Sequence, residues 1–125
     1  MKLGSLVGGT ATVIGREATV AEAAEALIAD GVGSLAVVEG SGLVGIITER
    51  DVVRCVSEGA DPEDEAVADW MSEAPDTFGP EVEVREAAEW LLEMGYRHMP
   101  VMQDGELLGI VSIRDILWAI ISAEE

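Results

Sequence analysis

The sequence has 125 residues, of which 49% are hydrophobic, and its 25 acidic side chains against seven Lys and Arg give a formal net charge of −18. A charge of this sign argues against nucleic acid and anionic membrane surfaces as partners, because both are held by Lys and Arg. The length suits one compact unit with an adequate core.

The first half of the chain is expected to form a strand, a helix, two strands and a second helix. Residues 10–14 suggest a short strand. Thr19 and Glu22 have the spacing of a capping box, and an amphipathic helix ending at Gly31 follows, with a predicted apolar face of Val20, Ala23, Ala24, Leu27 and Ile28. Residues 34–38 and 43–48 have the composition of two strands joined by a turn. Thr48 and Asp51 then resemble a second capping box at the start of a helix.

The second half repeats this order after a polar, acidic linker at residues 58–65. Residues 76–78 are the expected first strand. The helix that follows has a predicted apolar face of Val84, Ala87, Ala88, Leu91 and Leu92. Asp104-Gly105, between strands at 99–102 and 107–112, is the strongest hairpin signal in the chain. A last helix is expected from Arg114.

The two halves align at a constant offset without a gap, pairing Gly31 with Gly95, Val37 with Val101, Gly45 with Gly109, Arg50 with Arg114 and Asp51 with Asp115. Such a repeat indicates one β-α-β-β-α unit written twice. We therefore predict an α/β (α+β) fold of two motifs, residues 1–60 and 61–125 with a linker at about 58–66, packed about a pseudo-twofold axis. Residues 1–9 align with the segment before the second motif, which predicts a docked helical turn.

No motif in the sequence is typical of catalysis. The single histidine has no nucleophile motif beside it, the glycines lack phosphate-loop spacing, and Cys55 excludes both an internal disulfide and a Cys-rich metal site. The first residues do not show a charged region followed by an apolar run of signal length, and no apolar run approaches the length that spans a membrane. We expect a cytoplasmic protein that is not an enzyme and needs no cofactor or metal.

The repeat carries Pro100-Val101 before its second hairpin and a Gly-hydrophobic-x-Thr/Ser-x-x-Asp motif after each, at Gly45–Asp51 and Gly109–Asp115. This pattern resembles a pair of CBS motifs, the regulatory module named after cystathionine β-synthase, over about Leu3 to Ile121. The resemblance implies two small sheets that leave two symmetry-related clefts. In many members these clefts bind AMP, ADP, ATP or S-adenosylmethionine.

The resemblance implies ligand contacts in both copies. Thr48 and Asp51 would serve one cleft, and Ser112 and Asp115 the other, with the strand before each hairpin facing the adenine. The full implied set is Ser34, Leu35, Thr48, Asp51, Thr77, Arg97, His98, Met99, Pro100, Ser112, Arg114 and Asp115. The function implied is a stand-alone regulatory module, dimeric, that binds an adenine nucleotide and signals in trans to a protein effector.

A second interpretation needs no ligand. The Thr/Ser-x-x-Asp pairs are also ordinary N-caps, worth about 1 kcal/mol each, and the chain could be a structural or protein-interaction dimer with vestigial clefts. The copies also differ, because Arg97 and His98, which resemble phosphate-contacting residues, replace Gly33 and Ser34. The second cleft is therefore expected to hold a phosphorylated ligand better than the first.

Two further pairs of residues leave alternatives open. Arg50 and Arg114 precede the motif aspartates and are each expected to meet either an acidic side chain or a phosphate. Trp90 and Trp118 fit either a dimer contact or the core.

Overall fold

The structure, a computed structural model, describes residues 1–7 and 11–123 and divides into two compact units. One unit consists of Thr12–Pro75 and is called the continuous unit. The other combines Met1–Ala11 with Asp76–Glu125 and is called the composite unit. Both units combine helices with β-strands, so the predicted fold class is confirmed.

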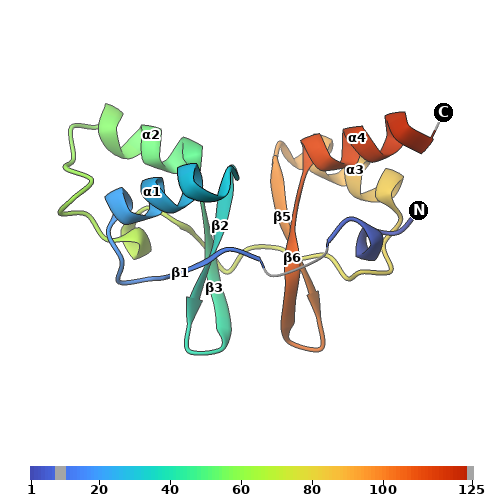
Figure 1. The fold of residues 1–125 in the computed structure, drawn as a ribbon, viewed down its shortest axis with the longest axis horizontal. Helices are drawn as coiled ribbons and strands as arrows, with labels where there is room; N and C mark the ends of the chain where they lie inside the picture. The colour runs from blue at the N-terminus through green and yellow to red at the C-terminus, as the bar shows by residue number, and fades with distance from the viewer. Residues whose placement is uncertain (8–10, 124–125) are drawn as a thin grey trace. The chain divides into compact units, whose positions relative to one another are not determined.

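The continuous unit contains a four-stranded sheet in the order β1-β2-β3-β4, with β1 parallel to β2 and the other pairs antiparallel. Two helices lie side by side against this sheet (Figure 1). In chain order the elements are β1 (Val13–Gly15), α1 (Val20–Asp30), β2 (Ser34–Glu39), β3 (Gly42–Thr48), α2 (Glu49–Ser57), the 3-10 turn η2 (Val67–Asp69) and β4 (Ser72–Glu73). The predicted capping box of Thr19 and Glu22 opens α1, and Gly31 ends it in the left-handed conformation.

The composite unit is built from the same parts but has a two-stranded antiparallel sheet. Its elements are η1 (Leu3–Ser5), α3 (Val84–Met94), β5 (His98–Gln103), β6 (Glu106–Ser112) and α4 (Ile113–Ala123). The strand expected at 76–78 is reduced to a single parallel bridge between Phe78 and Val101. Pro80 follows closely and has no N–H to continue the pairing. The predicted hairpin turn is present, with positive φ at Asp104 and Gly105.

A short turn at the start of the chain belongs to the composite unit. Leu3 N–H donates to the Val82 carbonyl at 2.9 Å, and Val84 N–H donates to the Met1 carbonyl at 2.8 Å. Leu3 is fully buried among residues of α3, β5, β6 and α4. The same pairing occurs in the continuous unit, where Val67 N–H donates to the Ala18 carbonyl at 2.8 Å. The predicted docked turn is confirmed over residues 3–5; Gly8 and Gly9 lie outside the described residues.

Each unit has its own hydrophobic core beneath its helices. Val20, Ala23 and Leu27 of α1 pack on Val37 and Ile47 of the sheet. Trp70 and Cys55 complete this core, as expected for Trp70. Burial raises the pKa of the Cys55 thiol, so the side chain stays protonated and serves packing.

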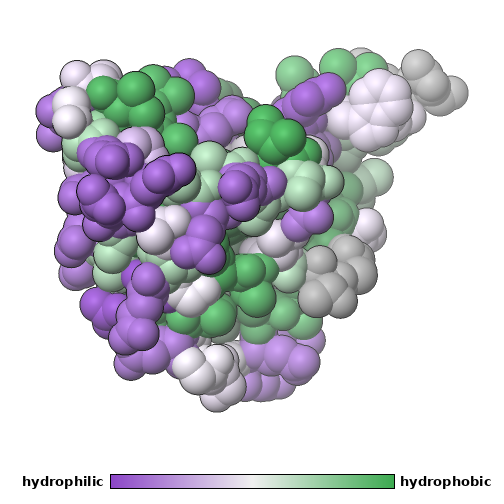
Figure 2. Space-filling model, turned by 60° about the vertical axis from the view of Figure 1, so that its left-hand side comes forward, coloured by the Kyte–Doolittle hydropathy of each residue, from purple (hydrophilic) through white to green (hydrophobic). Residues whose placement is uncertain are grey.

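The helices bury a narrower stripe than the sequence predicts. Ile28, expected on the buried face of α1, is 84% exposed, and Leu92 of α3 is 72% exposed. One sheet face covers only part of a helix, and these side chains lie next to the covered stripe rather than within it. Hydrophobic groups consequently reach the surface among the hydrophilic ones (Figure 2).

Replacement of Leu3 by Ala should destabilise the protein by about 2–5 kcal/mol, because it leaves a cavity in the core of the composite unit. Lys2→Ala is the matched control, since Lys2 is exposed and its loss should change the free energy of unfolding by less than about 0.5 kcal/mol. Urea unfolding followed by circular dichroism measures both. Equal stabilities for the two variants would contradict the docked position of Leu3.

Candidate functional site

The start of α2 is closed by a hydroxyl and a carboxylate that hydrogen-bond each other's backbone. Asp51 N–H donates to Thr48 Oγ1 at 3.3 Å, and Thr48 N–H donates to Asp51 Oδ2 at 2.8 Å. The Thr48 hydroxyl also donates to Asp51 Oδ2 at 3.1 Å. The capping box predicted from the spacing is therefore present, and both side chains are partly buried.

The start of α4 has the corresponding arrangement with Ser112 and Asp115. Asp115 N–H donates to Ser112 Oγ at 3.0 Å, and Ser112 N–H donates to Asp115 Oδ2 at 3.1 Å. Asp115 is exposed. Within the described residues its Oδ1 accepts no hydrogen bond, so one carboxylate oxygen remains available beside the N-terminus of a helix.

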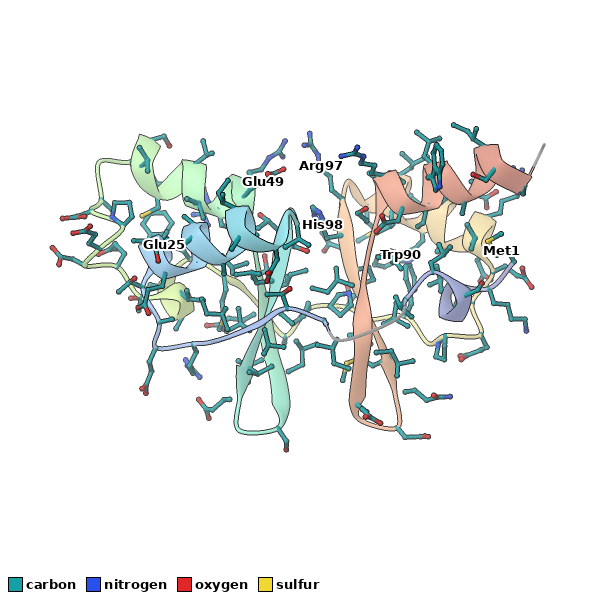
Figure 3. The ribbon with its side chains drawn as sticks, in the orientation of Figure 1. Met1, Glu25, Glu49, Trp90, Arg97 and His98 are labelled. Atoms are coloured by element: carbon teal, nitrogen blue, oxygen red, sulfur yellow. The ribbon has the colours of Figure 1, made fainter. Side chains whose placement is uncertain are left out.

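In each unit a backbone hydrogen bond joins the first residue of this helix to the residue just before the first strand of the hairpin, β2 or β5. Ile113 N–H donates to the Arg97 carbonyl at 2.8 Å, and His98 pairs with Ser112 in the strand register. Arg97 and His98 are thereby placed at the end of the sheet where α4 begins (Figure 3). In the continuous unit the equivalent bond joins Glu49 N–H to the Gly33 carbonyl at 3.0 Å. The basic pair Arg97-His98 and the uncharged pair Gly33-Ser34 therefore occupy equivalent positions in the two units.

The arginines at the start of α4 form no ion pair with another described residue. The ion pairs among residues 1–7 and 11–123 join Met1 to Glu83, Arg16 to Glu39, and Arg54 to Asp51 and Glu58. Neither Arg97 nor Arg114 takes part, and Arg50 of the continuous unit likewise contacts no acid there. In a protein with 25 acids, Arg97 and Arg114 therefore have no ion-pair partner among the described residues.

The remaining residues implied by the resemblance lie along the central strands. Thr77 is exposed and precedes Phe78, whose N–H donates to the Pro100 carbonyl at 3.0 Å. Met99 and Pro100 are buried, and so are Leu35 and Ser34. The side chains of Met99 and Leu35 belong to the two hydrophobic cores, so any ligand contact there involves the backbone.

Sequence reasoning missed one neighbour of the site, Arg54. Its guanidinium donates to Asp51 Oδ1 at 3.4 Å and to the Trp70 carbonyl at 3.1 Å. It also lies 5.0 Å from the centre of the Trp70 ring. The spacing of Asp51 and Arg54 on one helix face was a signal for this contact, whereas the approach of Trp70 was not.

Trp90 and Trp118, each expected either in a dimer contact or in the core, lie in different environments. Trp90 packs edge-on against Phe78, with ring centroids 5.5 Å apart, and against Tyr96 at 5.7 Å. It therefore contributes to the composite unit itself. Trp118 is 71% exposed on α4.

Comparison with known proteins identifies the family. The family model described as CBS domain matches twice, at residues 10–58 and 67–122. The chain belongs to the CBS domain family. It is 39% identical over 102 residues to an uncharacterized protein from Methanopyrus kandleri, covering 79% of this chain and 52% of that protein. Among the first curated relatives, the chain spans between 52% and 66% of their length.

Solved structures with similar folds are CBS proteins. A putative signal-transduction protein with CBS domains from Burkholderia ambifaria has a TM-score of 0.92 at 26% identity, covering all of this chain and 97% of the other. A CBS domain protein from Pyrobaculum aerophilum complexed with AMP has a TM-score of 0.86 at 26% identity, with coverage of 98% and 99%. The predicted family and the tandem arrangement are confirmed.

The described part of the chain contains neither a cluster of metal-ligating side chains nor a membrane-spanning helix. Its His, Cys, Asp and Glu side chains form no group of three or more that could hold a metal ion. None of its helices is long and apolar enough to cross a membrane.

Removal of the cap at α2 should be measurable as a loss of stability. Thr48→Ala removes both side-chain hydrogen bonds to Asp51 and should cost about 1 kcal/mol of unfolding free energy. Thr48→Ser keeps the hydroxyl and should retain most of that stability. If urea unfolding gives the same midpoint for all three proteins, the cap contributes nothing.

Proposed function

We propose that this CBS-pair protein is a regulatory module that binds an adenosine-containing ligand at the start of α4. The ligand would be a nucleotide such as AMP, ADP or ATP, or S-adenosylmethionine, and its binding would be signalled in trans to a protein effector. The observation that carries the proposal is the exposed Asp115 carboxylate, whose Oδ1 accepts no hydrogen bond among the described residues, at the helix start to which backbone pairing brings Arg97 and His98.

The chemistry of these groups suits a nucleotide. A carboxylate oxygen can accept from ribose hydroxyls, and the Ser112 hydroxyl can donate to sugar or phosphate while it accepts from Asp115 N–H. Arginine provides planar, charged donors for phosphate oxygens, and the N–H groups at the start of a helix favour an anion. The AMP complex of the Pyrobaculum aerophilum relative supports this ligand class.

The net charge of −18 limits which nucleotide is favoured. Repulsion from distant carboxylates is screened beyond about 8 Å at physiological salt, but nearby acids still oppose a polyphosphate. We therefore expect AMP, or a nucleotide whose charge is reduced by Mg²⁺, to bind more readily than free ATP.

We also propose that the module forms a homodimer through its helices. Large apolar side chains are exposed on α3 and α4 of the composite unit and on α1 and α2 of the continuous unit, namely Leu92, Leu117, Trp118, Ile121, Ile28, Val53 and Val56. Two copies of so acidic a chain repel each other, so self-association would require a contact of this apolar kind.

Calorimetric titration with AMP tests the ligand proposal. The wild-type protein should bind AMP, and Asp115→Asn, which keeps the shape of the side chain but removes its charge, should weaken binding at least tenfold. Asp69→Asn is the control, because Asp69 is exposed on the continuous unit and its loss should leave the dissociation constant unchanged. Circular dichroism would establish that each variant is folded.

The same titration separates the two functional interpretations. Wild-type protein that binds none of AMP, ADP, ATP with and without Mg²⁺, or S-adenosylmethionine at millimolar concentration would refute the ligand proposal. The structural or protein-interaction dimer would then be the better description.

Analytical ultracentrifugation tests the dimer. Leu117→Glu places a charge on the exposed apolar face of α4 and should shift the protein towards monomer. Gln103→Glu adds the same charge at an exposed position of the β5-β6 hairpin and should leave the sedimentation coefficient unchanged. A wild-type monomer at high micromolar concentration would contradict the proposal.

A further inference from the structure

The carboxylates of the two motif aspartates, Asp51 and Asp115, differ in how many hydrogen bonds they accept within the protein. Both oxygens of Asp51 are engaged: Oδ2 accepts from the Thr48 backbone and hydroxyl, and Oδ1 accepts from Arg54. The Asp51 side chain is only 14% exposed. Asp115 accepts one hydrogen bond, at Oδ2, within the described residues. A ribose that needs a carboxylate oxygen would find one on Asp115 but would have to displace Arg54 from Asp51.

Arg54 is held where it is by more than Asp51. Its guanidinium also donates to the Trp70 carbonyl and lies over the Trp70 ring, and it is 3.8 Å from a Glu58 oxygen. Trp70 is in turn fixed by the hydrogen bond from its indole N–H to Glu65 Oε1 at 2.9 Å. Four contacts on one side chain make displacement by a neutral hydroxyl unfavourable.

The composite unit lacks both the cation and the aromatic ring of this arrangement. At the constant offset of the repeat, Trp118 takes the place of Arg54 and Leu6 takes the place of Trp70. Trp118 is 71% exposed and has no charge to pair with Asp115. Leu6 offers a backbone carbonyl but no aromatic ring. Both sequence differences therefore remove groups that engage the motif aspartate, directly or through Arg54, in the continuous unit but not in the composite unit.

We infer that Arg54 closes the continuous unit to ribose binding by occupying Asp51, so that the protein binds one adenosine-containing ligand per chain, at Asp115. Arg54 is then a specificity-determining residue, and Asp51 serves only as the helix cap. This inference rests on the proposed function, because it assigns the ligand to one of the two copies.

The first test asks whether removal of Arg54 opens the second site. Adenosine is the probe because Gly33 and Ser34, which stand where Arg97 and His98 stand in the other unit, provide no charged group for a phosphate. In an Asp115→Asn background no adenosine should bind, whereas Arg54→Leu in that background should bind one adenosine per chain. Arg54→Lys in the same background keeps a cation at the position and should restore the closed state.

The second test transfers the closing group to the composite unit and uses AMP. In a Leu6→Trp background, which supplies the ring that Trp70 provides to Arg54, Trp118→Arg should weaken AMP binding at least tenfold by pairing with Asp115, while Trp118→Gln, which adds no charge, should weaken it no more than twofold. This pair remains decisive if Arg54→Leu fails to fold. Equal affinities for the two Trp118 variants would overturn the inference.

The outcomes separate the inference from the proposed function. Wild-type protein that binds two AMP per chain, one of them lost in Asp51→Asn, would refute the closing role of Arg54 while the proposed function stands. One AMP per chain, lost in Asp115→Asn and retained in Asp51→Asn, supports both. Wild-type protein that binds none of AMP, ADP, ATP with and without Mg²⁺, or S-adenosylmethionine would refute both.

Discussion

Backbone pairing between a lead-in turn and the segment before a helix closes each unit of this protein. Leu3 and Val84 make these hydrogen bonds in the composite unit, and Val67 and Val20 make them in the continuous unit. In both units the turn also places one fully buried side chain, Leu3 or Val67, in the core. A two-stranded sheet with two helices has little apolar surface to bury alone, so the turn supplies part of the core that the fold requires.

The two units share the same backbone arrangement at the start of α2 and α4 but differ in the side chains around it. In both units the N–H of the first helical residue donates to the carbonyl before the central strand, and a hydroxyl and an aspartate cap the helix. Around this common frame, Arg97 and His98 stand against Gly33 and Ser34, and Trp118 stands against Arg54. A shared scaffold with divergent neighbours is how one fold carries sites of different chemistry.

The capping boxes and the hairpin at Asp104-Gly105 could be predicted because each depends on residues close in sequence. Local hydrogen bonds and turn conformations follow from such short patterns. The approach of Trp70 to Arg54 and the placement of Leu3 beside Val82 could not be predicted in this way, since both depend on how distant segments pack. The exposure of Ile28 was missed because helical periodicity marks an apolar face without saying how much of it the neighbouring sheet covers.

One unit is formed by a single stretch of chain and the other by two separate stretches, and this difference affects the order in which they fold. Thr12–Pro75 contains every residue of the continuous unit, so its core can assemble from one stretch of chain. The hydrogen bond of Leu3 with Val82 instead joins segments separated by most of the polypeptide, and closing so long a loop costs entropy before its contacts form. During synthesis on the ribosome, we expect the continuous unit to fold first and the N-terminal turn to dock only after β6 and α4 have emerged.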